Sequence, residues 1–253
     1  MGTETRKVGL LVVALCLGLA TLGWAAPPTA ELAPPTVVVH NSAGAAGEGL
    51  VGLVTETLTA QAQAMPQVRA SVAQPWALEA DIASASLSRG KAEVRLVAEL
   101  TPPTGGLRYQ AEAVAEAPSA TEAAGKAARQ AMEDLGVCVN AKGSIYYYDD
   151  RKLEAWITIG SNQGLRLRAK VAFLRAGEKV GEGRVITVKD ADAIVRVDRK
   201  VPGGNVLVGD DVTVTRNGPR WAVDAQVAHE RRERNAGTFL AAAVLWGLIL
   251  VAR

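Results

Sequence analysis

Residues 91–117 read KAEVRLVAELTPPTGGLRYQAEAVAEA, and this stretch decides the fold prediction. Apolar residues alternate with charged or polar residues on both sides of a Pro- and Gly-rich turn at 101–106. A period of two is what a β-strand needs when one face of its sheet is buried and the other meets water. The stretch therefore predicts a β-hairpin with a buried face of Ala92, Val94, Leu96, Ala98, Leu100, Leu107, Tyr109, Ala111, Ala113 and Ala115.

A helix is predicted directly after the hairpin. Ser119, followed three residues later by Glu122, is the pattern of a capping box at a helix start. An alanine-rich face begins at Ala123, and small side chains there allow the helix to lie close to the sheet. Gly136 is the predicted stop, because glycine is favoured just after the end of a helix.

The residues before the hairpin complete a first module. Thr36–His40 is a β-branched run that predicts a buried strand, and an apolar helical face follows until Pro66 ends the helix. Val68–Val72 predicts a second strand, whereas residues 73–90 give no firm assignment. The order strand, helix, three strands and helix predicts a small α+β sandwich over residues 36–137, with its helices on one face.

Residues 138–217 predict a second module built from strands and turns. Strands this short, at spacings of about 8–12 residues, are typical of a small barrel of five or six strands, in which closure removes exposed edges. Cys138 lies in an apolar, strand-like context, which predicts a buried and unreactive thiol. The segments with strand patterns are Leu153–Ile159, Lys170–Arg175, Gly183–Lys189, Ala193–Asp198 and Asp211–Thr215.

Ordered sequence anchors in the second module point to a known family. They are Gly143-Ser-Ile-Tyr146, Ile157-Thr-Ile-Gly160-Ser-Asn-Gln-Gly164, Phe173-Leu-Arg175 with Val180-Gly181-Glu-Gly-Arg-Val185, and Val208-Gly209-Asp210-Asp211-Val212. This pattern resembles the C-terminal SH3-like barrel of flagellar assembly protein T and its relatives. In its order of elements, the first module resembles the domain shared by that family and the curli-secretion lipoproteins.

The resemblance covers about residues 36–217 and implies a periplasmic, cell-envelope protein built for binding and assembly. Two departures limit what is carried over. Arg168-Ala169 stands where the family has Gly-Asp, and the sequence lacks the lipid-anchoring cysteine and membrane-inserting segments of curli-secretion proteins. A flagellar role is therefore not carried over.

The first 25 residues have the pattern of a secretory signal peptide. Arg6 and Lys7 precede the charge-free run Val8–Leu22, and small residues at the −3 and −1 positions predict cleavage after Ala25. An uncleaved anchor helix is the alternative. Residues 26–35 form a Pro-rich spacer. These features predict export to the periplasm.

The last 36 residues predict a charged connector helix over residues 218–236 and an apolar helix over residues 237–253. Phe239–Ala252 would be about 21 Å long at 1.5 Å per residue, which suits only a thin bilayer. A membrane anchor is favoured over a helix packed in a homo-oligomer or partner, or on its own domain. The membrane-flanking residues would be Arg231, Arg232, Arg234 and Arg253, although export would place three of them outside, against the positive-inside tendency.

Composition leaves little material for chemistry. The chain has 28 Lys and Arg against 26 Asp and Glu, and a net charge of +2 gives no electrostatic reason to expect nucleic acid as a partner. Neither His40 nor His229 has metal ligands at a suitable spacing. The carboxylate pairs at 149–150 and 210–211 predict turn closure. The sequence therefore predicts no catalytic residue, no cofactor and no metal, and a protein that is not an enzyme.

Aromatic residues supply the candidate binding surface. Side chains of this kind on a strand surface can anchor a partner, although strand alternation would bury one or two of three consecutive tyrosines. The candidate residues are Tyr146, Tyr147, Tyr148 and Trp156. The prediction is a non-enzymatic cell-envelope protein that binds protein partners within a periplasmic or membrane complex. A periplasmic glycan- or solute-binding protein, or an exported enzyme with a site between the two modules, is the alternative.

Overall fold

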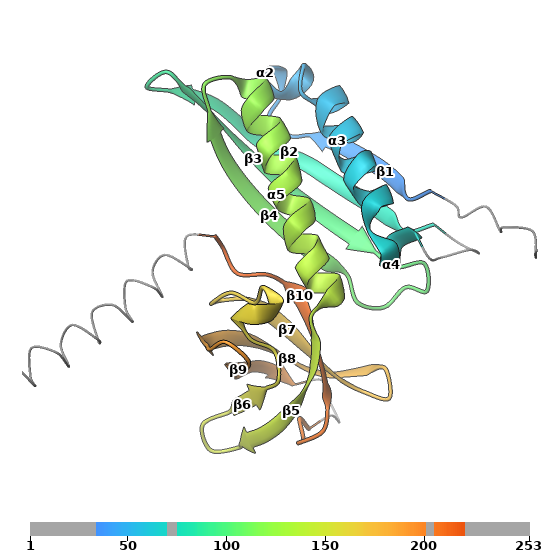
Figure 1. Cartoon of the computed structure of the whole chain (residues 1–253), viewed down its shortest axis with the longest axis vertical. Helices are drawn as coiled ribbons and strands as arrows, with labels where there is room; N and C mark the ends of the chain where they lie inside the picture. The colour runs from blue at the N-terminus through green and yellow to red at the C-terminus, as the bar shows by residue number, and fades with distance from the viewer. Residues whose placement is uncertain (1–33, 70–74, 201–204, 221–253) are drawn as a thin grey trace, which may run out of the picture. The chain divides into compact units, whose positions relative to one another are not determined.

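The computed structural model describes residues 34–69, 75–200 and 205–220, and all three ranges belong to one compact unit. The first part is a sheet of four strands, β1 (Thr36–Asn41), β2 (Ala77–Ser88), β3 (Lys91–Thr101) and β4 (Tyr109–Ala117). They lie side by side in that order; β1 is parallel to β2, and the other neighbours are antiparallel. Two long helices, α3 (Val51–Ala64) and α5 (Ala120–Asn140), cover one face of this sheet (Figure 1).

The predicted hairpin is confirmed in its place and, for most residues, in its buried face. Along β3, buried and exposed residues alternate for most of the strand, and on β4 Ala111, Ala113 and Ala115 are buried. The start of α5 is also confirmed, since the Ser119 hydroxyl accepts a hydrogen bond of 3.2 Å from the Glu122 N–H. Leu107 is the exception and lies before β4, half-buried.

Of the predicted strand at Val68–Val72 only Val68 and Arg69 are described, and both lie in a helix and not in a strand. Residues Pro66–Arg69 form the short helix α4, with Val68 buried, and a second short helix, α2 (Ala45–Glu48), lies in the loop after β1. The second strand is instead β2, in the region that had no firm assignment. Leu78, Ala80 and Ile82 are its buried residues. Only two of them, Leu78 and Ile82, are large, which explains why the alternation is weak in the sequence.

The predicted end of the long helix at Gly136 is also wrong, because α5 continues to Asn140. Cys138 therefore lies on a helix and not on a strand, and it is completely buried together with Leu135 and, nearly so, Val139. Burial of these side chains outweighs the cost of about 1 kcal/mol that a glycine brings to a helix interior.

The second part is a closed six-stranded β-barrel. Its strands are β5 (Lys142–Asp149), β6 (Glu154–Ile157), β7 (Lys170–Arg175), β8 (Glu178–Val188), β9 (Ala193–Lys200) and β10 (Asp211–Arg216), with the short 3₁₀ helix η1 (Ser161–Gln163) after β6. They pair in the order β10-β5-β6-β9-β8-β7, and β10 closes the ring by pairing with β7. The protein therefore has a barrel-containing α+β fold (Figure 1).

The two parts share strand pairing and a hydrophobic core. Arg216 of β10 pairs in parallel with Gln110 of β4, so the barrel continues the sheet order of the first part. Helix α5 packs on β4 and also on β10. Inside the barrel, Gly183 lets β8 approach its neighbour closely, since a Cβ atom there would lie 2.4 Å from a Val195 methyl group. Buried residues of both parts form one continuous cluster.

Several predictions fall outside the described residues. These are the signal peptide at 1–25, most of the Pro-rich spacer at 26–35, nearly all of the connector helix at 218–236, and the apolar helix at 237–253 with Arg231, Arg232, Arg234 and Arg253. Within the described part of the chain, no helix combines the length and the apolar character needed to cross a membrane.

Candidate partner-binding surface

The predicted aromatic residues lie on the antiparallel pair β5–β6 of the barrel. The register of this pair shifts between Ile145 and Tyr147, so Tyr146 is the extra residue of a β-bulge. A bulge interrupts strict alternation and redirects the side chains beside it. As a result two consecutive tyrosines are exposed, Tyr146 by 47% and Tyr147 by 51%.

Tyr147 and Trp156 form an aromatic pair across the two strands. They are direct neighbours in the register, and their ring centroids lie 4.8 Å apart with the planes at 75°. An edge-to-face pair of this kind holds both rings in place and is worth about 0.5–1.5 kcal/mol beyond the area that it buries. We call Tyr146, Tyr147 and Trp156 the aromatic surface.

Tyr148 belongs to the interior side of the barrel. It is half-buried and packs against the hydrophobic core, opposite the buried Ala155. Its hydroxyl lies 3.4 Å from an Asp150 carboxylate oxygen. The structure thus brings three of the four candidate residues together at the surface and separates the fourth, because the bulge ends before Tyr148.

A turn with exposed apolar side chains flanks the aromatic surface. Leu207 and Val208 are exposed by 51% and 60%, and the turn is hydrogen-bonded to Ile145, the residue before the bulge. Asp210 fixes the turn, because its buried carboxylate accepts hydrogen bonds from the Leu207 N–H and from Arg175 at 2.8–2.9 Å. The pKa of Arg175 is raised by these hydrogen bonds with Asp210.

One member of each predicted carboxylate pair closes a turn. Asp149 accepts hydrogen bonds from the Arg151 and Lys152 N–H groups and closes the β5–β6 turn. Asp210 closes the turn before β10. Within the described residues no three His, Cys, Asp or Glu side chains gather as a metal site would require. His40 lies exposed on β1, and His229 lies outside the described residues.

Cys138 is chemically protected. Its side chain is completely buried on α5, and burial, which disfavours the thiolate, raises its pKa to about 12. Its Sγ lies 3.9 Å from the Gln110 carbonyl oxygen. The predicted unreactive thiol is therefore supported by its surroundings, although the element that carries it is a helix.

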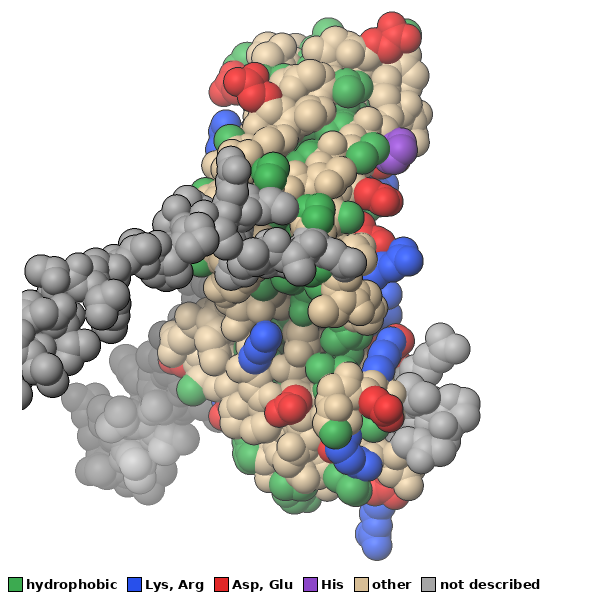
Figure 2. All heavy atoms as spheres, turned by 90° about the vertical axis from the view of Figure 1, so that its right-hand side faces the viewer, with side chains coloured by type: hydrophobic (Ala, Val, Ile, Leu, Met, Phe, Trp, Pro, Cys, Tyr) green, Lys and Arg blue, Asp and Glu red, His purple; other side chains and the backbone are tan. Residues whose placement is uncertain are grey.

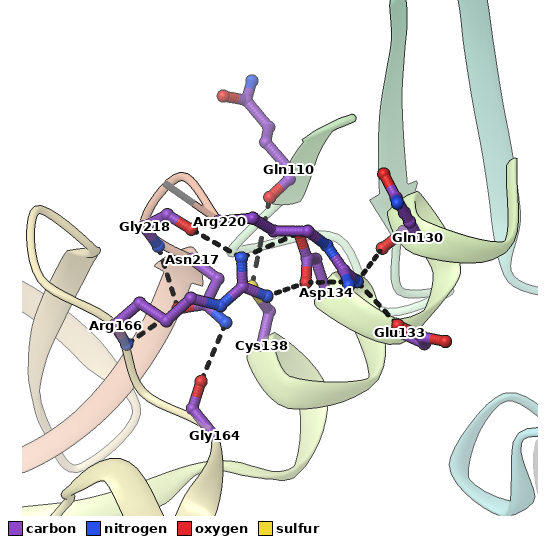
Figure 3. A network of polar contacts seen from close by, with 10 residues as sticks. All are labelled: Gln110, Gln130, Glu133, Asp134, Cys138, Gly164, Arg166, Asn217, Gly218 and Arg220. Atoms are coloured by element: carbon purple, nitrogen blue, oxygen red, sulfur yellow. Dashed lines mark hydrogen bonds and ion pairs between the residues drawn. The ribbon is translucent and has the colours of Figure 1, made fainter. Parts of the chain in front are cut away.

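A polar network at the junction of α5 and the barrel was not found from the sequence. The buried carboxylate of Asp134 accepts hydrogen bonds from Arg166, which follows η1, and at 3.4 Å from Arg220 (Figure 3). The Arg166 guanidinium also donates to the Gly218 carbonyl at 2.8 Å. Asn217 accepts from the Arg166 N–H and donates to the Gly164 carbonyl. We call this set the junction network.

One signal for the junction network was present in the sequence. Asp134 falls on the same helical face as Ala127, Ala131 and Cys138, at spacings of three or four residues. A carboxylate on an otherwise apolar face needs a partner, because an unpaired buried charge is costly. The pattern indicates a buried ion pair, but the partner on a distant loop cannot be read from it.

One face of the molecule carries mixed charge. On the face drawn in Figure 2, Lys and Arg side chains are interspersed with Asp and Glu, and hydrophobic side chains show in small groups between them. Comparison of the chain with protein-family models gives no match, and comparison with curated proteins gives none either.

Proposed function

We propose that this protein is a non-enzymatic binding module of the cell envelope, which uses its barrel to hold a protein partner in a larger complex. The observation that carries the proposal is the aromatic surface. Tyr146 and Tyr147 are about half exposed because of the β-bulge, and Tyr147 is in edge-to-face contact with the ring of Trp156.

Residues of this kind are well suited to bind protein. Tyr and Trp bring a large apolar area with few rotatable bonds, so ordering them on binding costs little entropy. Leu207 and Val208 extend the exposed apolar area beside them. An apolar area with hydroxyl groups at its edge fits a protein surface that offers both hydrophobic side chains and hydrogen-bond acceptors.

The setting in the cell envelope is part of the same proposal. In this proposal the barrel is an SH3-like barrel that follows a small α/β sandwich, and the protein is a relative of flagellar assembly protein T. The six-stranded closed ring and the strand–helix–sheet order support that assignment. Residues 1–25 are the proposed signal peptide for export to the periplasm. Phe239–Ala252 is the proposed apolar helix for membrane association.

Site-specific photo-crosslinking in the cells that make the protein tests the binding surface. A photoreactive phenylalanine at Tyr147 is expected to give a discrete crosslinked product, because that ring is at the proposed interface. The same residue at Leu87, which is 75% exposed on β2, is the matched control. Trp156→Ala should weaken the product formed at 147, since it removes the ring that holds Tyr147 in place.

The crosslinked products at positions 147 and 87 together decide whether the aromatic surface binds a partner. A product at 147 that is absent at 87 and sensitive to Trp156→Ala supports the proposal, and its mass identifies the partner or shows a second copy of the chain. The absence of any product at 147, or the same products at 147 and 87, contradicts it.

A further inference from the structure

A row of basic side chains crosses three neighbouring barrel strands. Lys170 of β7 is paired in register with Arg216 of β10 on one side and with Arg184 of β8 on the other. Residues directly opposite each other have Cβ atoms roughly 5 Å apart and point to the same face of the sheet. We call Arg216, Lys170 and Arg184 the basic row.

Such a row is unfavourable without something to balance it. Like charges directly opposite each other on neighbouring strands repel and destabilise the pair. Along the next strand the row reaches Arg196, which is paired with Arg184 and lies 3.3 Å from a Glu154 carboxylate oxygen. Arg196 is thus neutralised by an acidic neighbour. Lys170, in the middle of the row, has no such neighbour in the part of the chain that the structure describes, as shown below.

All three residues of the basic row line a surface cavity of about 470 Å³ beside the β4–β10 contact. Two more basic residues, Arg168 and Arg220, line it, and Glu112 is the one acidic residue of its lining within the described part of the chain. A second cavity of about 490 Å³ shares Lys170 and Arg216 with the first. Arg108 and Lys179 also line the second cavity, but Lys179 pairs with Glu182 of the same lining and Arg108 lies 2.9 Å from a Glu99 carboxylate oxygen, so Lys170 supplies the unbalanced charge there.

The acidic neighbours balance only part of this charge. Glu112 pairs with Arg216 but also with Arg95, and Arg220 is held at 2.6 Å by Glu133. Arg184 has Asp198 at 3.9 Å, with both side chains about half exposed, so water screens that contact.

Lys170 has no carboxylate within ion-pair distance among the described residues. It is exposed and stands at the centre of the row, shared by the two cavities. A positive potential therefore remains where the two cavities meet.

Arg168 adds a backbone signal at the same place. Its φ angle is 69°, in the left-handed region that L-residues other than Gly, Asn and Asp seldom adopt. Its N–H is fixed by a hydrogen bond of 2.9 Å to the Val185 carbonyl, and its side chain lines the first cavity. Strained residues of this kind concentrate at binding and catalytic sites.

We propose that the basic row binds the phosphate groups of an extended anionic ligand, one group in each cavity, with Lys170 and Arg216 between them. Arg guanidinium groups match phosphate oxygens in pairs, and Lys supplies a mobile point charge. The ligand takes the place of the missing counter-charge and relieves the repulsion in the row. This site does not depend on the aromatic surface, which lies on β5 and β6, so either assignment can fail alone.

Calorimetric titration of the full chain with inorganic tripolyphosphate tests the site at low salt. Saturable binding is expected, and Lys170→Glu should weaken it at least about tenfold, as expected for loss of a charge-assisted hydrogen bond. Lys126→Glu is the matched control, because Lys126 is exposed on α5, lines neither cavity and gives the same change in net charge.

Lys170→Gln separates binding from folding. Because it removes the central charge of a repulsive row, its Tm should equal or exceed that of the wild type, while affinity for tripolyphosphate falls. The same concentration of tripolyphosphate should raise the Tm of the wild type and of Lys126→Glu by equal amounts, and raise the Tm of Lys170→Gln by clearly less.

Vesicles containing an anionic phospholipid provide the second arm. Binding of tripolyphosphate that depends on Lys170 assigns a free phosphate-bearing ligand. Binding to vesicles alone, again dependent on Lys170, assigns a lipid headgroup. The proposal is overturned if neither probe binds, or if Lys126→Glu weakens binding as much as Lys170→Glu, because net charge alone would then explain the effect.

Discussion

At the scale of single residues, the junction network shows how one buried carboxylate decides how α5 meets the barrel. The Asp134 side chain is 6% exposed and the Arg166 side chain 12%, so Arg166 is the buried partner of Asp134, whereas Arg220 contacts the same carboxylate from a more exposed position. Breaking such a pair from one side is costly, whereas replacing both partners with apolar groups can be nearly neutral.

Asp134→Ala is therefore expected to reduce the free energy of unfolding by about 3–5 kcal/mol, because Arg166 would stay buried without its partner. The double variant Asp134→Ala/Arg166→Met should be clearly less destabilised than Asp134→Ala alone. Urea unfolding followed by circular dichroism measures both. Equal losses in the single and double variants would show that the ion pair is not what stabilises this contact.

Cys138 gives a second expectation at this scale. In a Cys16→Ser background the native protein should react very slowly with a thiol reagent at pH 8, because the thiol is completely buried and its pKa is raised to about 12. The same protein in denaturant should label at once. Stability gained from the neutral buried thiol is present below pH 9 and is lost as the pH rises toward 12, so Cys138→Ala should reduce that alkaline loss. Rapid stoichiometric labelling of the native form would contradict this.

At the scale of elements, the contact between η1 and α5 depends on a glycine. Gly164 ends η1 with a φ of 81°, and a Cβ atom there would lie 2.8 Å from a Val137 methyl group of α5. Gly177, in the β7–β8 turn, has a nearly equal φ of 83° and open space around it. Substitution of Gly177 therefore measures backbone strain alone, whereas substitution of Gly164 measures backbone strain and close packing together.

Gly177→Ala is expected to cost about 1–2 kcal/mol, which is the penalty of the left-handed conformation alone. Gly164→Ala should cost more, because Val137 must also move, and Gly164→Ala/Val137→Ala should recover part of the difference. Thermal unfolding of the three variants measures it. If both glycine variants lose the same stability, close packing at the contact is not important.

The elements also show what can be read from the sequence. Lys170–Arg175 was predicted with its observed bounds, and the β3–β4 hairpin with its buried face, because alternation is a local pattern. The alternation of β2 is weak because only Leu78 and Ile82 are large and fully buried in it, and the end of α5 is not predicted because Gly136 stops a helix only where tertiary packing does not oppose it. Sequence alone identified the aromatic residues, but the bulge that exposes Tyr146 exists only in the register with β6. The basic row is likewise a product of register, since its residues come from three separate strands.

At the scale of the whole molecule, the proposal places a folded barrel and sheet between two apolar terminal segments, each with a separate role. Residues 1–25 are proposed to direct export and Phe239–Ala252 to hold the protein at a membrane. Cleavage after Ala25 should leave a protein whose amino-terminal residue is Ala26, which Edman or mass-spectrometric sequencing of the exported protein detects. An intact Met1 on the exported protein would favour the uncleaved anchor instead.

Deletion of Phe239–Arg253 should move the protein from the membrane fraction to the soluble periplasmic fraction, since it removes 14 consecutive residues without a polar side chain. The same deletion should leave the crosslink at Tyr147 and the binding of tripolyphosphate in place, because those surfaces lie on the barrel. Arg231→Ser/Arg232→Ser is the control for attraction by charge alone, and it should leave the full-length protein in the membrane fraction. If the shortened protein still sediments with membranes, the apolar segment is not the anchor, and the barrel surfaces become the candidates for membrane attachment.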